Sequence, residues 1–408
     1  MTTSNPNPFP AGNDLAALKG LKVLSLSHVV AGPLAAGLLA DFGADVVHVE
    51  DPVKGDPARH LGFERDGVYV WWKVAGRNKR SVTIDLRKPE GAELARELAS
   101  WADVVICSIR PSTMKRWGLD FESLRAVNNR LIMLQITGFG MTGPKSEEPG
   151  FGKVGEAMSG VVAITGRPDE PLHSAFSHAD SVTGLMGAFG IMTAMYRRDH
   201  DAAFKGELID LALFEPLFRL IEWQVIAWDQ LGMAPARSGN RLGFAPAAVA
   251  NVYQSSDKVW ITVTSATVGS VLNTVRMIGL PTDDFQTVVQ QRAQAELIDV
   301  TLKEWIGRHT AEEALAAMRD AGVVASKIYG IQDIMSDPVY AAREDIITVP
   351  DRDLGPIKMQ AVIPKMSNHA GSVWRSGPVL GEDNELVFKD WLQLSAERFE
   401  WLRAAAVI

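Results

Sequence analysis

Residues 21–50 read LKVLSLSHVVAGPLAAGLLADFGADVVHVE, and this stretch decides the fold. Its first part, 21–28, is mostly apolar and is typical of a buried strand. The apolar residues from Leu34 to Phe42 then recur at helical spacing, and Gly43 follows where a helix ends. Residues 45–50 form a second strand pattern. Because a helix joins the two strands through short loops, the stretch predicts a β-α-β unit and a parallel sheet.

The same alternation continues to residue 140. Strand patterns occupy 81–86, 102–106 and 131–136, and helix patterns occupy 89–100 and 121–127. Pro89 stands at the start of the first of these helices, a position that proline favours. We therefore expect an α/β fold, with a Rossmann-like large domain doubly wound around a parallel sheet.

The second half of the chain predicts a further, smaller domain. Helix patterns cover 153–198 and 207–232, with a break near Thr165-Gly166-Arg167-Pro168. Val252-Tyr253 and the run from Val259 to Val263 then flank Ser255-Ser256-Asp257-Lys258, which is typical of a turn and predicts an antiparallel hairpin. Further patterns are helices at 266–279, 287–307 and 311–322, a strand at 323–329, and then strands with a closing helix from 395. A hairpin followed by helices indicates a small α+β domain.

The composition of the 408-residue chain is that of an ordinary globular protein. The net charge is −8 and no block of basic residues occurs, so we expect no nucleic-acid partner. The polar, proline-rich start, 1–17, predicts a loose arm rather than a signal peptide, and the apolar runs are too short to predict a membrane span. The single cysteine, Cys107, lies in an apolar run and is interpreted as a buried thiol. A chain without disulfides fits a reducing compartment, so we expect a cytoplasmic protein.

Signatures of the common cofactors are missing from the sequence. There is no GxxxxGK[ST] loop, and the turn SHVVAGP after the first strand lacks G-x-G-x-x-G. The eight histidines show no metal-binding spacing, and no G-x-S-x-G motif occurs. The sequence therefore predicts neither a metal site nor a tightly bound cofactor.

Three clusters of basic residues follow or precede the predicted strands: Lys54 and Arg59; Arg77, Lys79 and Arg80; Arg110, Lys115 and Arg116. Open α/β sheets bind ligands at the carboxyl ends of their strands. An acidic protein that binds a phosphate-bearing ligand must concentrate positive charge locally. Each cluster alone is also compatible with a solvated loop, but three beside one sheet favour a phosphate-bearing ligand.

The segment Ser177-His178-Ala179-Asp180 opens a predicted helix. An acid at that position is commonly a helix cap. The alternative is a carboxylate that backbone N–H groups position and keep ionised, so that it attacks an acyl carbon. Near Gly239, the segment SGNRLG is either a turn or a flap that closes over a site and excludes water.

In their order along the chain, these segments resemble the class III CoA-transferases, the family of the formyl-CoA:oxalate and carnitine enzymes. The similarity covers residues 18–405 and is carried by LKGLKVLSLSHVVAGPLAAGLLADFGADVVHVE, NKRSVTIDLRKPEG, ITGFGMTGP, EAMSGVVAITGRPDEP, RSGNRLGFAPAAVANVY and LGEDNELVF. Six ordered motifs identify the family, but they do not identify the substrate.

The resemblance implies a role for individual residues. Asp180, in HADSVTG, stands at the position of the family's nucleophilic aspartate, and Gly239 belongs to the flap over the reacting thioester. Gly150-Phe151-Gly152 replaces the common G-Y-D, so Phe151 would line a drier and larger acyl end of the CoA site. Asp51 stands where an arginine often stacks on adenine, and Lys54 or Arg59 would have to substitute for it. The remaining residues implied to bind CoA are Val30, Ala31, Arg77, Asn78, Lys79, Ser108, Ile109, Arg110 and Arg116.

The resemblance also implies a domain plan and an assembly. The large CoA-binding domain would take 18–234 and 326–408, and the small domain would be inserted at 235–325. Members of the family form interlocked homodimers, in which each chain threads through the other. We therefore expect a homodimer, with CoA and acyl-CoA as substrates rather than as bound cofactors.

The implied activity is transfer of CoA from an acyl-CoA, with succinyl-CoA as the favoured donor, to a carboxylic acid. Asp180 would form a mixed anhydride and then an aspartyl-CoA thioester. Two other functions stay open: an isomerase like the 2-methylacyl-CoA racemases, and a non-catalytic acyl-CoA-binding protein. In the racemases a histidine base stands where this chain has Phe151, which argues against an isomerase.

Overall fold

The computed structural model describes residues 16–241 and 249–408, which form two compact units. The first runs to Gly160, resumes over Ser174–Ile221 and is completed by Ala341–Ile408; the second comprises Val161–His173 and Glu222–Tyr340. The second unit contains the expected insertion at 235–325, but it begins earlier and ends later along the chain. Residues 1–15 of the expected arm and 242–248 of the SGNRLGFAP segment lie outside the described residues.

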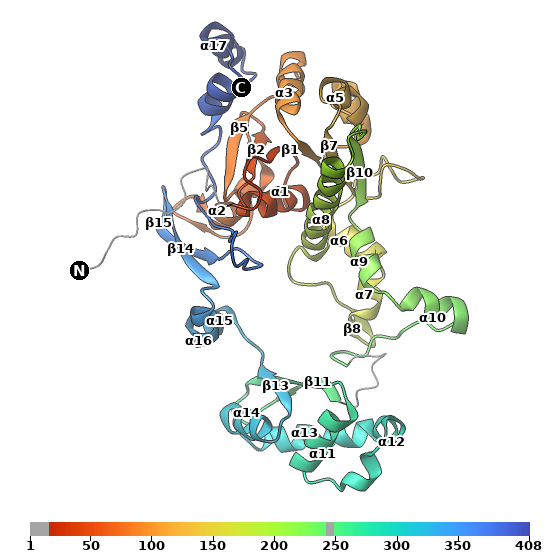
Figure 1. Ribbon diagram of the computed structural model, residues 1–408. Helices are drawn as coiled ribbons and strands as arrows, with labels where there is room; N and C mark the ends of the chain where they lie inside the picture. Colours follow the sequence, from red (N-terminus) through yellow and green to blue (C-terminus); the bar gives the residue numbers. More distant parts are fainter. Residues whose placement is uncertain (1–15, 242–248) are drawn as a thin grey trace, which may run out of the picture. The chain divides into compact units, whose positions relative to one another are not determined.

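A six-stranded sheet forms the centre of the first unit (Figure 1). Every neighbouring pair of strands is parallel, which confirms the predicted parallel α/β sheet. The strands, in spatial order, are β10 (Glu207–Ala212), β7 (Ile132–Thr137), β6 (Val104–Cys107), β1 (Lys22–Leu26), β2 (Asp45–Glu50) and β5 (Lys79–Thr83).

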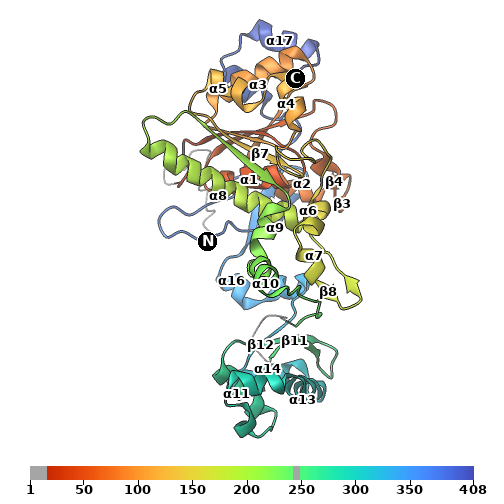
Figure 2. The same cartoon turned by 90° about the vertical axis from the view of Figure 1, so that its right-hand side faces the viewer.

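Helices cover both faces of this sheet (Figure 2). On one face lie α3 (Pro89–Trp101), α5 (Phe121–Val127) and α17 (Ala396–Ala404), and on the other lie α1 (Ala31–Asp41) and α8 (His178–His200). A Cβ at Gly184 of α8 would lie 2.9 Å from the carbonyl oxygen of Ala31, so the glycine allows α8 to approach α1 closely. This contact places the start of α8 beside the start of α1.

The predicted helix over 207–232 is wrong at its start, because Glu207–Ala212 is strand β10. Leu208 packs into the core on one face of the sheet and Ile209 into the core on the other, as alternation along a strand requires. A short apolar run fits a buried strand and a helix equally well, and pairing with β7 decides for the strand. Two helices follow, α9 (Glu215–Leu220) and α10 (Gln224–Leu231).

The C-terminal part of the chain covers the outer edge of strand β5. The Asp383 carboxylate accepts the Ser81 N–H at 2.9 Å, and the Asp383 N–H donates to the Ser81 carbonyl at 3.0 Å. Asn384 likewise accepts the Thr83 N–H at 2.9 Å. These bonds satisfy backbone groups that an exposed edge strand would present to another chain. The LGEDNE segment therefore has a structural role in closing the sheet.

Shorter elements complete the first unit: η1 (Pro57–His60), β3 (Glu64–Arg65), β4 (Val68–Tyr69), α2 (Val70–Ala75), α4 (Pro111–Trp117), α6 (Gly152–Met158), β14 (Ile346–Asp351), β15 (Gly355–Gln360) and the π-helical turn η3 (Leu386–Trp391). The continuous helical pattern expected over 153–198 is interrupted. Between α6 and α8 lie α7 (Val161–Ile164) and a two-residue hairpin, β8 (Gly166–Arg167) with β9 (Glu170–Pro171), both in the second unit.

The second unit is built on a three-stranded antiparallel sheet, β11 (Val249–Gln254), β12 (Trp260–Ser265) and β13 (Val324–Lys327). The predicted hairpin is thus confirmed. The helices are α11 (Val268–Met277), η2 (Thr282–Phe285), α12 (Val288–Ala293), α13 (Ala295–Gly307) and α14 (Ala311–Asp320). The single helix expected at 287–307 is two helices, and α15 (Ile331–Ser336) and α16 (Pro338–Ala342) occupy residues expected to be strand. No helix in the described part is long and apolar enough to cross a bilayer.

Candidate active site

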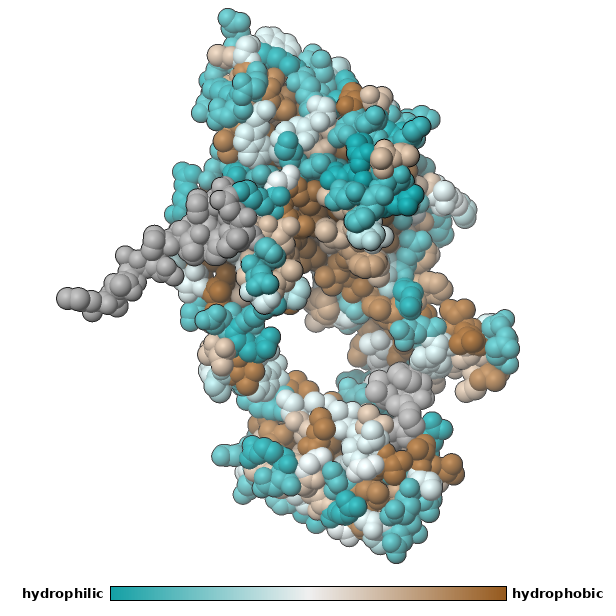
Figure 3. Space-filling view, viewed as in Figure 1, coloured by the Kyte–Doolittle hydropathy of each residue, from teal (hydrophilic) through white to brown (hydrophobic). Residues whose placement is uncertain are grey.

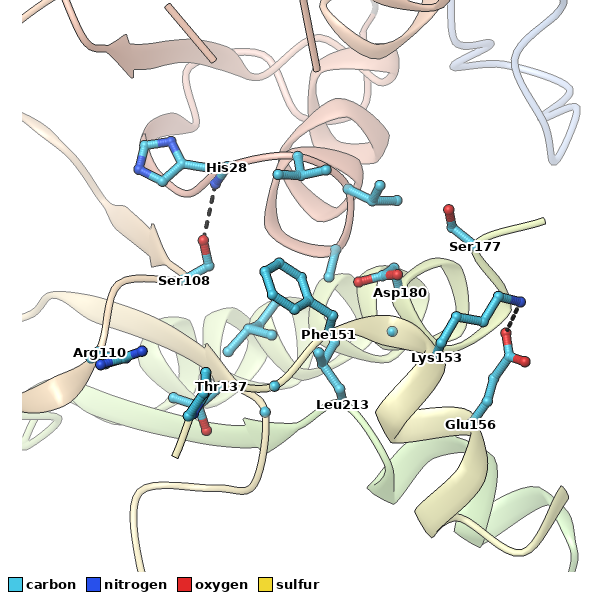
Figure 4. A pocket seen from close by; sticks show the side chains of 18 of the residues that line it. His28, Ser108, Arg110, Thr137, Phe151, Lys153, Glu156, Ser177, Asp180 and Leu213 are labelled. Atoms are coloured by element: carbon cyan, nitrogen blue, oxygen red, sulfur yellow. Dashed lines mark hydrogen bonds and ion pairs between the residues drawn. The ribbon is translucent and has the colours of Figure 1, made fainter. Parts of the chain in front are cut away.

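A cavity of about 540 Å³ lies at the carboxyl ends of strands β1, β6 and β7 (Figure 4). Its lining comes from the loops that follow these strands, from the start of α6 and from the start of α8. The lining residues are His28–Ala31, Leu61, Trp71, Ser108, Arg110, Pro111, Ile136–Gly138, Ser146, Glu148–Lys153, Glu156, Ser177, Asp180 and Leu213. The cavity is thus where the sequence predicted a ligand, at the carboxyl edge of a parallel sheet.

Asp180 is the third residue of α8, and its carboxylate lines this cavity. Burial raises the pKa of Asp180, and the nearby Glu156 carboxylate raises it further, while Lys153 acts in the opposite direction. One of the two interpretations left open by the sequence was that backbone N–H groups keep this acid ionised. The backbone N–H of Asp180 does favour the charged form, but removal from water outweighs it. The carboxylate is therefore poorly solvated, which makes it a stronger nucleophile when ionised.

Gly152 forms the surface against which the Asp180 carboxylate lies. A Cβ built on Gly152 would lie 2.0 Å from Oδ2 of Asp180 and 2.8 Å from its Cγ. No side chain fits at Gly152 while the carboxylate keeps this position. The glycine that replaces the aspartate of the common G-Y-D therefore makes room for Asp180.

Lys153 and Glu156 form an ion pair beside Asp180, with 2.9 Å between Nζ and Oε1 (Figure 4). Glu156 is almost fully buried, at 1% exposure. The Lys153 ammonium also donates to the carbonyl oxygen of Ser174 at 2.6 Å, which ties α6 to the segment before α8. The sequence did not single out Lys153 and Glu156, and it showed Gly152 only as a departure from G-Y-D. Lys153 and Glu156 are three residues apart on a predicted helix, a spacing that allows an ion pair, but nothing in the sequence indicated that Asp180 lies beside them.

His178 does not contact the nucleophile candidate. Its Nδ1 lies 3.1 Å from Oγ of Ser174, and its ring packs against Phe176. Its described contacts therefore serve the turn that leads into α8.

Comparison with known proteins identifies the family of the chain. Residues 18–384 match the model of CoA-transferase family III. The chain belongs to CoA-transferase family III. It is accordingly an enzyme that moves CoA between an acyl thioester and a carboxylic acid.

Relatives of this CoA-transferase match it along nearly their whole length. The succinyl-CoA–D-citramalate CoA-transferase of Chloroflexus aurantiacus is 39% identical over 398 residues, which cover 96% of this chain and 98% of the relative. The succinate–glutarate CoA-transferase of Agrobacterium fabrum is 31% identical over 91% of this chain and 96% of its own. A solved CaiB/BaiF family protein from Brucella suis, 30% identical, superposes with a TM-score of 0.80 over 92% of this chain and 99% of its own.

Val30, Ala31, Ser108, Arg110 and Phe151, all predicted to bind CoA, line the cavity of the CoA-transferase. The Ser108 hydroxyl accepts the His28 N–H at 3.0 Å (Figure 4), so it fixes the loop after β1. The Phe151 side chain is 74% exposed at the mouth of the cavity. The structure brings these five residues together with Asp180.

Arg77, Asn78 and Lys79 do not line this cavity, and their side chains are engaged elsewhere in the first unit. Arg77 pairs with Asp41 at 2.6 Å and Asn78 donates to the same carboxylate at 2.8 Å. Lys79 is 2% exposed, and its ammonium donates to the carbonyl oxygen of Ala75. Burial lowers the pKa of Lys79 to about 8, although Asp56 and Asp41 partly offset this. The basic cluster at 77–80 thus has partners within the protein, which its sequence did not reveal.

The other predicted residues lie outside the cavity lining. The half-buried Ile109 packs against the core, and Arg116 is exposed on α4. Arg59, considered as a partner for adenine, instead forms an ion pair with Glu50 at 2.6 Å and stacks on Trp72. Gly239 belongs to the second unit, where its N–H donates to the carbonyl oxygen of Gly166 at 2.9 Å. In this conformation the Gly239 N–H is not available to an oxyanion.

Proposed function

We propose that this enzyme transfers CoA from succinyl-CoA to a carboxylic acid, with Asp180 as the residue that carries the acyl and CoA groups in turn. The observation that carries the proposal is the placement of a partly desolvated carboxylate, Asp180, in a cavity at the carboxyl edge of the sheet. The printed name of the Chloroflexus aurantiacus relative, which includes succinyl-CoA, supports succinyl-CoA as the donor.

The proposed reaction begins with attack of the Asp180 carboxylate on the thioester carbon. The carbon–sulfur bond breaks, leaving a mixed anhydride and the CoA thiolate. The thiolate then attacks the aspartyl carbonyl, which releases the donor acid and leaves an aspartyl-CoA thioester. The acceptor carboxylate attacks this thioester and expels the CoA thiolate, which gives a second mixed anhydride. The thiolate then attacks the acyl carbon of the acceptor, which forms the new acyl-CoA and releases the Asp180 carboxylate. Asp180 ends unchanged, so a single carboxylate suffices for both half-reactions.

The apolar part of the cavity supports this route because a mixed anhydride is destroyed by water. Trp71, Ile136, Phe151 and Leu213 contribute apolar surface around Asp180. Excluding water protects the intermediate and strengthens the electrostatic interactions of the attacking carboxylate. Arg110, exposed at the cavity, has no partner among the described residues and is our candidate for the anionic part of the CoA ester.

We further propose that the enzyme is a homodimer, interlocked as the family resemblance implies. Helix α8 carries an exposed apolar row of Leu185, Phe189, Met192 and Tyr196, of which Phe189 is 69% exposed. Helix α10 of the second unit likewise exposes Val225, Ile226, Trp228 and Leu231 (Figure 3). Exposed apolar rows of this kind are typical of surfaces that another chain covers. Light scattering should give twice the chain mass, and a monomer at micromolar concentration would remove this part of the proposal.

The test of the catalytic proposal compares the wild type with Asp180→Ala and Asp180→Asn. Each protein is mixed with succinyl-CoA or acetyl-CoA and a panel of dicarboxylic and branched acids, and new CoA esters are measured by mass spectrometry. We expect transfer by the wild type, no transfer by either variant and similar CoA binding by all three. Transfer that persists in Asp180→Ala would exclude Asp180 as the nucleophile.

The same samples separate the alternative functions. Incorporation of deuterium at the α-carbon of a 2-methylacyl-CoA, without an acceptor acid, would indicate an isomerase. Tight CoA binding without transfer to any acid would indicate a binding protein. Hydroxylamine added during turnover should trap Asp180 as its hydroxamate, a mass change that neither alternative produces.

A further inference from the structure

Val29, in the loop after β1, has an unusual backbone conformation. Its φ is +68°, in the left-handed region that β-branched residues rarely adopt. Val29 and Val30 line the cavity that contains Asp180, and they also line a second, apolar cavity of about 520 Å³ beside it. A change of this loop would therefore alter the lining of both cavities at once. Strained residues of this kind persist only where their surroundings hold them.

The residue that holds Val29 is Asp56, which follows the neighbouring strand β2. The Val29 N–H donates to both carboxylate oxygens of Asp56, at 3.1 and 3.2 Å. Asp56 is fully buried and also accepts the Ala58 N–H at 2.7 Å. Burial alone would raise the pKa of Asp56, but the hydrogen bond and charge of His48 help lower it to about 2. The carboxylate is thus ionised at neutral pH and is a strong acceptor for the strained N–H.

Other buried groups fix Asp56 in turn. Nε2 of His48 lies 3.1 Å from Oδ2 of Asp56, and Nδ1 of the same ring lies 3.1 Å from Oγ of Ser25. The Asp56 N–H donates to Glu50 at 2.9 Å, and Glu50 is itself held by Arg59. The carboxylate therefore has a single well-defined position between strands β1 and β2.

We propose that Asp56, held by His48, is a positioning residue that keeps Val29 in its left-handed conformation and so sets Val30 and Ala31 against the reacting thioester. Asp56 lines neither of the two cavities, so it acts through the loop and not on the substrate. The proposal rests on the transfer reaction proposed for Asp180. A rigid loop matters to that reaction because misplacement of reacting groups by about 1 Å reduces rates by about 100-fold.

The test uses the full chain and the pair of thioester and acid that the wild type converts fastest. We expect Asp56→Ala to lower kcat/KM by about 30- to 100-fold. Val29→Gly removes a side chain from the cavity lining but adopts positive φ without strain, so its own kcat/KM is measured as the reference for the double variant. The double variant Asp56→Ala/Val29→Gly should have a kcat/KM at least about tenfold higher than that of Asp56→Ala. A purely structural role of Asp56 predicts no such recovery.

Two controls make the result decisive. Asp351 is a buried carboxylate of β14 that pairs with Lys73 at 3.1 Å and accepts a hydrogen bond from Ser376. Asp351→Ala should lower the melting temperature and leave kcat/KM within about twofold. Asp180→Ala, assayed in parallel, must be inactive; if it is active, the proposed function fails rather than the role of Asp56.

The role of Asp56 is overturned if Asp56→Ala keeps activity within threefold of the wild type, or if Val29→Gly restores nothing. If Asp56→Ala does not fold, Asp56→Asn replaces it, alone and combined with Val29→Gly. Asparagine keeps the volume and one acceptor oxygen, so we expect a loss of about three- to tenfold that Val29→Gly reverses. An unchanged activity, or a loss that Val29→Gly leaves in place, rejects the proposal equally.

Discussion

Replacing Gly152 by alanine tests whether the position of the Asp180 carboxylate limits catalysis. The new methyl group would lie 2.0 Å from Oδ2 of Asp180, whereas ordinary van der Waals contact begins at 3.4 Å. The carboxylate must therefore move by about 1.4 Å or rotate away from its place. Displacement by about 1 Å costs roughly 100-fold in rate, or about 2.7 kcal/mol of activation free energy. We expect kcat to fall by this amount or more.

The assay is steady-state transfer followed by mass spectrometry, together with direct measurement of CoA binding. Binding should change little, because the cavity residues other than Asp180 keep their places. Gly269 provides a matched control because both glycines lie in the first turn of a helix, Gly152 in α6 and Gly269 in α11. A Cβ at Gly269 would have no atom within 4 Å. Gly269→Ala should have wild-type kcat. If Gly152→Ala is folded and fully active, the Asp180 carboxylate does not act from the position described.

Three further predictions concern charged side chains. Glu156 raises the pKa of Asp180 and Lys153 lowers it. In the pH profile of kcat/KM, Glu156→Gln should therefore move the acidic limb to lower pH, and Lys153→Met should move it to higher pH. Shifts of the two variants in the same direction would contradict this. The pKa of Lys79 is about 8 in the folded chain and 10.5 in the unfolded chain. Between these two pH values Lys79 is therefore mostly deprotonated in the folded chain and protonated in the unfolded chain. The free energy of unfolding of the wild type should therefore rise with pH in this range relative to Lys79→Met, by up to about 1.4 kcal/mol per pH unit in urea titrations. Asp383→Ala should lower the free energy of unfolding by about 3 kcal/mol, measured by the same titrations, since it leaves the buried Ser81 N–H without its acceptor and removes one of the two carboxylates that pair with Arg375.

The sheet of the first unit could be predicted because its strands are short apolar runs separated by amphipathic helices. The strand at 45–50 and the helix at 121–127 agree with β2 and α5 residue for residue. Strand β10 could not be predicted in the same way. Its apolar residues serve cores on both faces of the sheet, so they show no one-sided pattern, and only β7 as a neighbour makes the segment a strand.

The candidate site was predictable where the residue type itself limits the chemistry. A carboxylate at the start of a small-residue helix, in the order of motifs shared with the family, was enough to select Asp180. The partners of basic side chains were not predictable, because charge in a sequence does not show which acid neutralises it. Arg77 is paired with Asp41, 36 residues away along the chain, and only the fold brings them together. Gly152 was noted as a departure from a motif, but its reason is the carboxylate that lies against it.

The cover over β5 also has a consequence for biosynthesis. Asp383 and Asn384, which bind the outer edge of strand β5, follow their partners Ser81 and Thr83 by 302 and 301 residues along the chain. While the intervening residues are made, the nascent sheet therefore carries an unprotected edge. Such edges recruit strands from other chains, so the growing polypeptide is vulnerable to misassembly until Asp383 and Asn384 have been added. Variants truncated before Asp383 should for this reason accumulate in inclusion bodies, even when the cavity residues are intact.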